Sequence, residues 1–426
     1  MKRDPGPVLV HVLFGLLVLA YFFAFFFRVS AAVILPRLAS EIGMSAAMTG
    51  FLSSLYYYSY AAVQPLCGSL NDRWGPLRVV AAGLCVASAG AAIFMFASDP
   101  WSLAAGRLLT GLGLGPMFSG ALVFQANAFP PYRYSFYSSI TLAVGNLGAV
   151  VSVGPLGLAL DRWGRGSVFL FLALASLLLA GLLLLKRKDD PVLAASQGTQ
   201  RRALGLRGQL RTGFSTMASC RELRSLTLLW SICAAATLSF QGLWSVAWYQ
   251  TAYGPAASAA RGWASAIGLG VMAGTLLGGR ILPATEDRLR ALKLGFCLNL
   301  GAWILLWLGI YWLVPFFLTG TLGFLVGVTS GILMVHCPTA VNEMAPRSRA
   351  GAVLGVANML VMVCAVAFQW GTGAILGRFH ATAAGAYSAT GFLVTYGAVI
   401  AVIASSAMTL SRMRNFAEAV RKAAAE

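Results

Sequence analysis

The stretch Gly68-Ser-Leu-Asn-Asp72-Arg73-Trp-Gly75-Pro-Leu-Arg78 separates two apolar runs, residues 46–67 and 77–97. Each run is about long enough to cross a membrane as a helix, which takes ~20 largely apolar residues. Glycines at both ends of the stretch permit a tight turn and a close approach of two helices. The sequence therefore predicts a hairpin of two membrane-spanning helices, joined by a short charged loop.

Ten further apolar runs extend the same pattern along the chain. Of the 426 residues, 58% are apolar and only 10% are charged, whereas about a quarter of an ordinary soluble protein is charged. The composition excludes a soluble globular protein and predicts an all-α polytopic membrane protein. The twelve expected helices cover residues 9–36, 46–67, 77–97, 101–125, 135–159, 166–185, 225–251, 263–283, 291–311, 314–337, 350–376 and 386–410.

A polar, basic segment over residues 186–224 divides these helices into two sets of six. We expect an N-terminal bundle over 1–185, a cytoplasmic linker over 186–224, a C-terminal bundle over 225–410 and a cytoplasmic tail over 411–426. Asp72-Arg73 and Asp287-Arg288 occupy matching places in the two halves, at an offset of 215 residues. Parallel repeats of this kind are typical of one architecture of secondary transporter.

The formal charge of +18 is explained by topology. With the N-terminus inside, 24 of the 31 lysines and arginines fall in inner loops, the linker and the tails, and five fall outside. This bias is the positive-inside pattern, so the charge implies no nucleic-acid partner. We expect a bacterial inner-membrane protein with both termini in the cytoplasm.

Four segments resemble signatures of the major facilitator superfamily. The loop from Gly68 to Arg78 is similar to its signature loop, and residues 103–113, around Arg107, are similar to its helix-4 pattern. Residues 154–157 and 343–351 resemble its helix-5 pattern and its loop between helices 10 and 11. The resemblance implies two pseudo-symmetric six-helix bundles that transport by alternating access.

Two arginines, Arg28 and Arg107, lie within expected spans, whereas all 13 acidic residues lie in loops, tails or helix ends. A charge inside the membrane needs compensation. At 1.5 Å per residue, Arg28 is about 12 Å from Pro36 and Arg107 about 9 Å from Trp101, which gives both a similar depth. The resemblance places both around a central cavity, where two guanidinium groups would bind an anion.

The spacing from Arg28 to Pro36 is similar to helix 1 of the organophosphate:phosphate antiporters and the anion:cation symporters. In both groups the resemblance implies that this arginine binds the anionic substrate. The chain departs from the symporters at Phe27, where they have an aspartate, and from the antiporters around Gln241, where they have a second arginine. Substrate identity therefore does not transfer.

Other polar and aromatic residues complete the predicted sites. Substrate-binding candidates besides the two arginines are Tyr21, Gln64, Asn146, Gln241, Trp244, Trp248 and Asn358, of which Gln241, Trp244 and Trp248 share one face of a regular helix. Gating candidates on the cytoplasmic side are Gly68, Asp72, Arg73, Gly75, Arg78, Arg133, Glu343 and Arg349. Asp72 is expected to accept hydrogen bonds at a helix N-terminus or from Arg133. Glycines at 270, 274 and 278, and Gly148 with Ser152, are expected to form a smooth contact between the two halves.

These features predict a monomeric secondary transporter for a small anion, an organic carboxylate or a phosphate-type compound. A coupling ion, H⁺ or Na⁺, or a counter-anion accompanies it, and membrane lipids surround it. Two alternatives are an antiporter of drugs or hydrophobic solutes against protons, which the missing membrane carboxylate disfavours, and a non-transporting sensor with the same fold. No enzyme active site, metal-spaced cluster, cofactor motif or ATP-binding loop occurs in the sequence.

Overall fold

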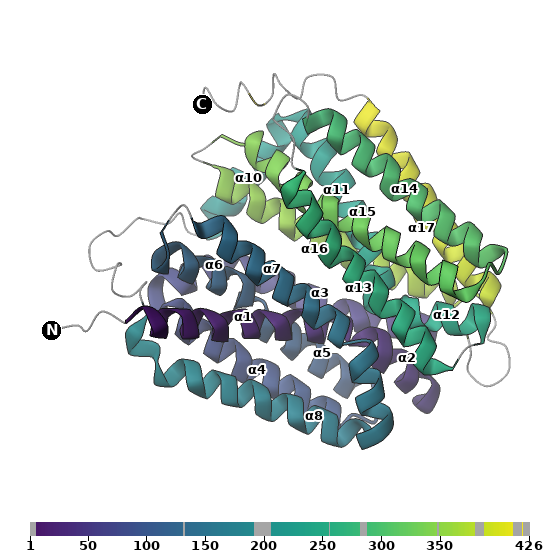
Figure 1. Cartoon of the computed structure of the whole chain (residues 1–426), viewed down its shortest axis with the longest axis horizontal. Helices are drawn as coiled ribbons and strands as arrows, with labels where there is room; N and C mark the ends of the chain where they lie inside the picture. Colours follow the sequence, from purple (N-terminus) through teal and green to yellow (C-terminus); the bar gives the residue numbers. More distant parts are fainter. Residues whose placement is uncertain are drawn as a thin grey trace. The chain divides into compact units, whose positions relative to one another are not determined.

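The computed structural model describes residues 6–130, 133–190, 206–254, 256–281, 288–346, 349–379, 387–411 and 420. These residues form helices and connecting turns, with no strand among them (Figure 1). In that part of the chain, ten helices are long and apolar enough to cross a membrane, and Phe136–Val151 is a shorter apolar helix. The predicted all-α membrane architecture is confirmed.

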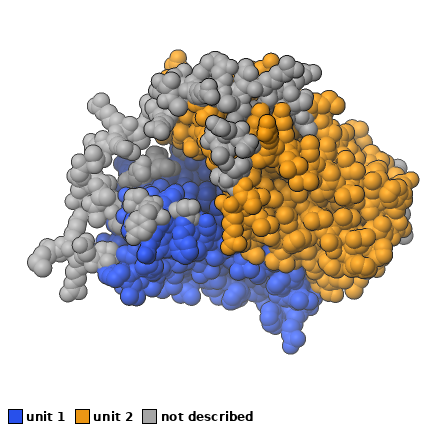
Figure 2. All heavy atoms as spheres, turned by 45° about the horizontal axis from the view of Figure 1, so that its top comes forward, with its two compact units in different colours: residues 1–30, 55–203 blue, residues 31–54, 204–426 orange. Residues whose placement is uncertain are grey.

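The chain forms two compact units, coloured separately in Figure 2. Unit 1 comprises residues 1–30 and 55–203, and unit 2 comprises residues 31–54 and 204–426. Residues 31–54, which fall in the predicted N-terminal bundle, belong to unit 2. The predicted bundles over 1–185 and 225–410 therefore stay a prediction.

In unit 1, α1 packs on α7 and α4 packs on α5 and α8. The helices of this unit are α1 (Pro7–Val29), the part of α3 (Ala46–Trp74) from Leu55 onward, α4 (Pro76–Phe96), α5 (Pro100–Leu114), α6 (Pro116–Ala128), α7 (Tyr134–Val151), α8 (Gly154–Leu185) and the short η2 (Arg187–Asp189).

In unit 2, α13 packs on α15, and α11 packs on α16 and α17. The helices of this unit are α2 (Ala31–Ile42), the first part of α3, α10 (Leu206–Ser219), α11 (Arg221–Ser239), the π-helical turn η3 (Phe240–Trp244), α12 (Ser245–Tyr253), α13 (Ala257–Arg280), α14 (Arg288–Tyr311), α15 (Phe316–Glu343), α16 (Ala350–Leu376) and α17 (Ala389–Ser411). The helix α10 lies inside the segment 186–224 that the sequence predicted only as a polar linker, and it packs on α16.

The charged loop predicted after residue 67 is shorter than expected. The helix α3 continues through it to Trp74, and Gly75 alone forms the turn, with a φ of 79° that favours glycine. Pro76 then occupies the first position of α4, where a missing N–H is harmless. The backbone N–H of Leu77 donates a hydrogen bond of 3.1 Å to the Asp190 carboxylate, so an acid from the predicted linker caps this helix N-terminus.

Three expected spans are interrupted. The first is divided at Ser30, between α1 and α2, and the fourth is divided at Gly115, directly before Pro116. The fifth is divided at Ser152 and Val153, between α7 and α8. The helix α8 holds the end of the fifth span and the whole sixth span, and it turns sharply between them at Gly164, where φ is 74°. Proline removes a helix hydrogen bond and glycine tolerates a positive φ, which accounts for the interruptions at Pro116 and Gly164.

The small-residue stripes pack inside their own units, so the expectation that they form a contact between the two halves is wrong. Gly270 and Gly274 lie against the backbone of α15 at Phe324 and Val328, leaving no room for a side chain. Gly148 lies equally close to the backbone of Phe22 in α1. These glycines allow close helix packing, as in other membrane bundles.

Candidate functional site

The guanidinium of Arg28 lies on the last turn of α1, in unit 1. Its Cζ atom is 3.7 Å from the centroid of the Phe25 ring, a cation–π distance. Arg28 is half-buried, and its buried Nε atom has no hydrogen-bond partner among the residues that the structure describes. No ion pair of Arg28 occurs there either. The guanidinium of Arg28 therefore lies over an aromatic ring and has N–H groups available to donate hydrogen bonds.

Aromatic side chains surround this arginine. The Tyr21 ring lies edge-on to Phe25 at 5.0 Å and stacks on Phe118 of α6 at 5.0 Å. Four tyrosines on α1 and α3 lie within electrostatic range of Arg28, namely Tyr21, Tyr56, Tyr57 and Tyr60. Arg28 and Tyr21, both predicted to bind substrate, therefore belong to one aromatic cluster within unit 1.

Arg107 has a different environment from Arg28. Only 2% of its surface is exposed, and its Nη1 donates a hydrogen bond of 3.0 Å to the carbonyl oxygen of Phe27. The Tyr56 ring lies 5.0 Å from its Cζ, and the Tyr56 hydroxyl donates to the Ala24 carbonyl at 2.9 Å. The last carbonyls of a helix lack partners within the helix and carry its negative dipole end. Arg107 therefore caps α1.

The other unit 1 candidates donate hydrogen bonds to backbone carbonyls. Gln64 donates from Nε2 to the Gly115 carbonyl at 3.4 Å, beside the interruption before Pro116, and its side chain lies near Tyr60. Asn146 is 4% exposed and donates from Nδ2 to the Leu142 carbonyl of its own helix at 2.9 Å. Through Tyr60, Gln64 is linked to the cluster around Arg28.

The unit 2 candidates are buried in an aromatic core. Trp244 donates from Nε1 to Thr372 at 2.9 Å, and Trp248 stacks on Tyr396 at 4.5 Å. Both tryptophans are at most 1% exposed, and Gln241 is 4% exposed. The π-helical turn η3 begins at Phe240, so the regular spacing that predicted one shared face does not hold here. Asn358 is half-buried on α16.

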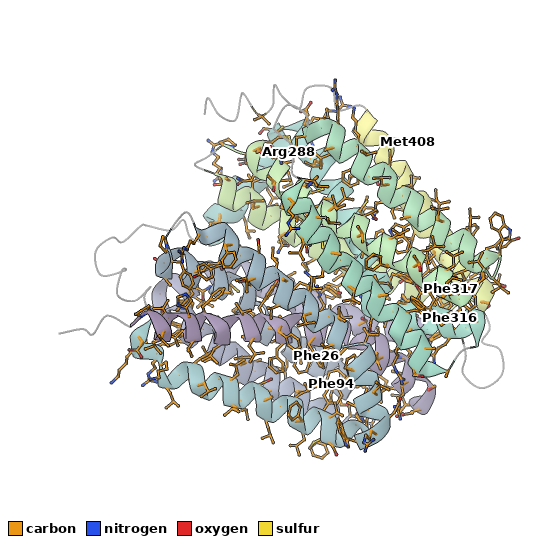
Figure 3. All side chains as sticks on the ribbon, in the orientation of Figure 1. Phe26, Phe94, Arg288, Phe316, Phe317 and Met408 are labelled. Atoms are coloured by element: carbon orange, nitrogen blue, oxygen red, sulfur yellow. The ribbon has the colours of Figure 1, made fainter. Side chains whose placement is uncertain are left out.

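The gating candidates divide into exposed arginines and one ion pair. Arg73, Arg78, Arg133 and Arg349 are exposed, and Gly75 forms the turn before α4. Glu343, at the end of α15, accepts from Nη2 of Arg288 at 2.6 Å (Figure 3 labels Arg288). The side chain of Asp72 and the surroundings of Gly68 lie outside the described residues, so the pairing predicted for Asp72 stays a prediction.

The Arg288–Glu343 pair and the Asp190 cap were missed by sequence reasoning. Arg288 was noted only as half of a repeated Asp-Arg motif. The sequence did contain a signal for the pair. Arg288 lies near the start of one expected helix, and Glu343 lies near the end of the next, so two antiparallel helices would bring them to the same side. Asp190 gave no local signal, because it contacts a helix that begins 114 residues earlier, at Pro76.

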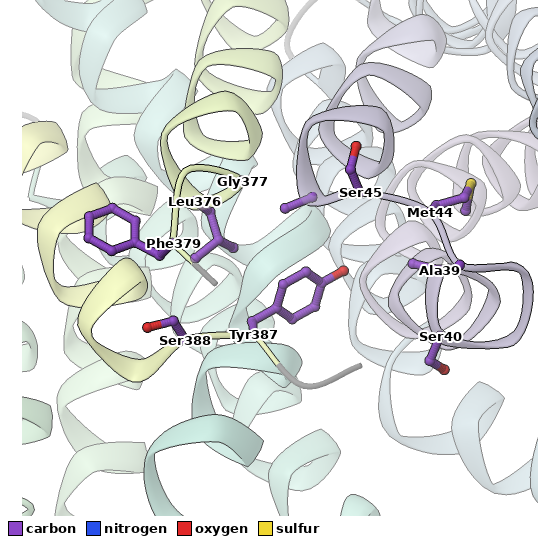
Figure 4. Close-up of a pocket in the computed structure, with 11 residues that line it drawn as sticks. Ala39, Ser40, Met44, Ser45, Leu376, Gly377, Phe379, Tyr387 and Ser388 are labelled. Atoms are coloured by element: carbon purple, nitrogen blue, oxygen red, sulfur yellow. The ribbon is translucent and has the colours of Figure 1, made fainter. Parts of the chain in front are cut away.

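A separate pocket of about 350 Å³ lies within unit 2 (Figure 4). Its lining includes Ser40, Met44, Ser45, Leu376 and Tyr387. Among the described residues, no charged side chain lines it, in contrast to the Arg28 cluster.

Comparison with known proteins identifies the family. The sequence profile of the Major Facilitator Superfamily matches residues 17–369. This chain belongs to the Major Facilitator Superfamily. It is therefore a transporter of that superfamily and a multi-pass membrane protein.

Relatives within the superfamily include proteins named for anions. The chain is 26% identical over 395 residues to "Probable anion transporter 2, chloroplastic" of Oryza sativa, covering 87% of this chain and 72% of that protein. It is 27% identical over 167 residues to "Probable sulfoacetate transporter SauU" of Cupriavidus necator, covering 39% of each. That match therefore spans about two fifths of the relative's length.

The fold of this superfamily member is also that of solved transporters. A bacterial homologue of the human lysosomal transporter Spinster, in an inward-facing and unoccupied conformation, matches with a TM-score of 0.74. The match covers 98% of both chains at 16% identity. At this identity the likeness concerns the fold, and it agrees with the helix order described above.

Proposed function

We propose that this protein is a secondary active transporter of a small organic anion, bound at Arg28. The observation that carries the proposal is a half-buried guanidinium in a membrane-spanning helix, with a buried Nε that has no hydrogen-bond partner among the described residues. A charge in this setting is stabilised by a counter-charge, and a guanidinium can bind an anionic group through two parallel hydrogen bonds. The names of the anion-transporting relatives support the same class.

The surroundings of Arg28 favour one kind of anion. The guanidinium of Arg107 is engaged with the Phe27 carbonyl, so the site offers one arginine instead of the expected two. Tyr21, Phe25 and Phe118 supply aromatic surface next to it. One cation beside apolar surface favours a carboxylate or sulfonate with an organic body over inorganic phosphate, which at neutral pH carries more charge and no apolar part.

Transport by alternating access, in the inner membrane of a bacterium and with cytoplasmic termini, completes the proposal. Substrate access would be controlled at the cytoplasmic ends of the helices, where Arg73, Arg78 and Arg349 are exposed and Arg288 pairs with Glu343. The N–H groups of Arg28 that lack partners among the described residues support an anion as the substrate, and not a cationic drug. Gln64 is retained as a substrate-site residue because it lies near Tyr60 of the cluster.

The test is a thermal-shift screen of the purified full chain against carboxylates, sulfonates, phosphate, nitrate and cationic drugs. We expect stabilisation by an organic anion, and we expect Arg28→Ala to weaken its binding by about tenfold to a hundredfold, the value of one charged hydrogen-bonding group. The control is Arg37→Ala, which removes an exposed arginine that pairs with Glu41. Stabilisation by cations alone, or unchanged binding by Arg28→Ala, would show the proposal to be wrong.

A further inference from the structure

An apolar groove of about 790 Å³ lies on unit 1, between α1 and the two legs of α8. We call it the phenylalanine groove. Phe22, Phe23 and Phe26 of α1 line one side (Figure 3 labels Phe26), and Pro155, Ala159 and Phe171 of α8 line the other. Its volume falls in the range of small-molecule sites, yet none of the described side chains that line it is charged.

The rim of the groove is exposed aromatic surface. Phe171 is 69% exposed and Trp163 is 64% exposed. Both belong to α8, which is apolar and long enough to cross a membrane. In a bilayer, such a surface faces hydrocarbon chains, so the groove is open to lipid tails along its length.

Two arginines lie close in sequence to the lining of the groove. The helix α8 turns at Gly164, and the turn carries Arg162 and Arg165, which are one and two residues away from the lining residues Trp163 and Ser167. Neither arginine forms an ion pair with any residue that the structure describes, and the adjacent Asp161 has a partner. Tryptophan and arginine at the end of a span are typical of the membrane–water interface.

From this arrangement we propose that the phenylalanine groove binds one acyl chain of an anionic phospholipid, whose phosphate is held by Arg162 and Arg165. The apolar lining selects a hydrocarbon chain, and the two guanidiniums at the turn of α8 select a phosphate by charge and by paired hydrogen bonds. The site is separate from the Arg28 cluster, because none of its lining residues belongs to that cluster.

The experiment is native mass spectrometry of the full chain, titrated with phosphatidylglycerol or with phosphatidylcholine of the same acyl chains. We expect wild-type protein to bind phosphatidylglycerol more tightly. Arg162→Ala with Arg165→Ala should reduce that preference by about tenfold to thirtyfold, from ~1 kcal/mol per arginine near a lipid surface. The control Arg221→Ala with Arg378→Ala removes the same charge from exposed positions elsewhere and should leave the preference unchanged.

A second pair of variants tests the acyl-chain part. Ala159→Trp fills the groove and should reduce binding of both lipids, whereas Leu158→Trp, at an exposed neighbouring position outside the lining, should not. Thermal unfolding of each variant separates loss of the site from loss of the fold. Equal binding of the two lipids by wild-type protein, unchanged binding by Ala159→Trp in a folded protein, or a second copy of the chain in place of lipid would overturn the proposal.

Discussion

The guanidinium of Arg107 on α5 donates a 3.0 Å hydrogen bond to the carbonyl oxygen of Phe27 on α1, 80 residues away in sequence. The same carbonyl accepts a bond of 3.0 Å from the Ser30 hydroxyl, at the point where α1 ends. Phe27 is thus held by two donors directly beside Arg28. The position of the substrate arginine in our proposal is therefore set by the residue before it and by Arg107.

The first prediction concerns the different roles of the two arginines. Arg107→Met should lower the free energy of unfolding by about 1–3 kcal/mol, because the Phe27 carbonyl loses the charged one of its two hydrogen-bond donors, and Arg28→Ala should change stability much less. Both variants should weaken binding of an anion that stabilises the wild-type protein. Thermal unfolding in detergent, with and without that anion, measures both effects. An Arg107→Met protein of wild-type stability that no longer binds the anion would instead make Arg107 a direct ligand.

The second prediction concerns the Arg288–Glu343 pair, whose side chains are only 6% and 22% exposed. Removing one partner, as in Arg288→Met, leaves the other charge buried and should lower the free energy of unfolding by about 3 kcal/mol. Combining it with Glu343→Met should recover part of that loss. The exposed pair Arg37–Glu41 is the matched control, since breaking it with Arg37→Ala should change stability by less than about 1 kcal/mol.

A double-mutant cycle on thermal unfolding checks this prediction. A coupling energy near zero between Arg288 and Glu343 would mean that the pair contributes nothing to the stability of the fold. If Arg37→Ala lowered the free energy of unfolding as much as Arg288→Met, burial would not explain the effect.

The third prediction concerns Asp99, which caps α5. Its Oδ1 accepts from the backbone N–H groups of Ser102 at 3.1 Å and Trp101 at 2.9 Å. The bonds from Ser102 and then Trp101 lower the pKa of the Asp99 carboxyl. Because its pKa is lower in the folded than in the unfolded state, the cap stabilises the protein above the unfolded pKa of about 3.9 and loses this effect as the pH falls through the folded pKa.

Asp99→Ala should therefore lower the Tm at pH 7, and the difference from wild type should shrink as the pH falls below about 4. Asp99→Asn is the control, because asparagine also caps helices but does not titrate. Thermal unfolding at pH 7 and at low pH provides the measurement, and a difference that stays constant with pH would contradict the cap.

The fourth prediction concerns the packing of α13 on α15. A side-chain carbon at Gly274 would collide with the backbone of Val328, whereas one at Gly279 of the same helix would meet nothing. Gly274→Ala should destabilise the protein by about 1–3 kcal/mol or more through overpacking. Gly279→Ala should be neutral or slightly stabilising, because alanine favours helix. Equal stability of the two variants would contradict the close packing.

The positions of the membrane-spanning helices were predictable because apolar length alone determines them. The partner of Arg107 was not, because a backbone carbonyl such as that of Phe27 has no sequence signature. Gln241, Trp244 and Trp248 were assigned one face by a rule that assumes 3.6 residues per turn, and the π-helical turn η3 breaks that rule. Arg28 was predicted as a charge without an acidic partner because every acid in the sequence lies in a loop, a tail or at a helix end, and it forms no ion pair with the residues that the structure describes.

Residues 31–54 belong to unit 2 although most of unit 1 follows them in sequence. This has a consequence for expressing the protein as two separate fragments. The helix α2 packs on η3 and α12 within unit 2, although it is encoded before every helix of unit 1 except α1. A gene cut in the 186–224 segment would leave the C-terminal fragment without a helix that covers its own core. That fragment alone should be prone to aggregation and degradation, and co-expression with the N-terminal fragment should rescue it.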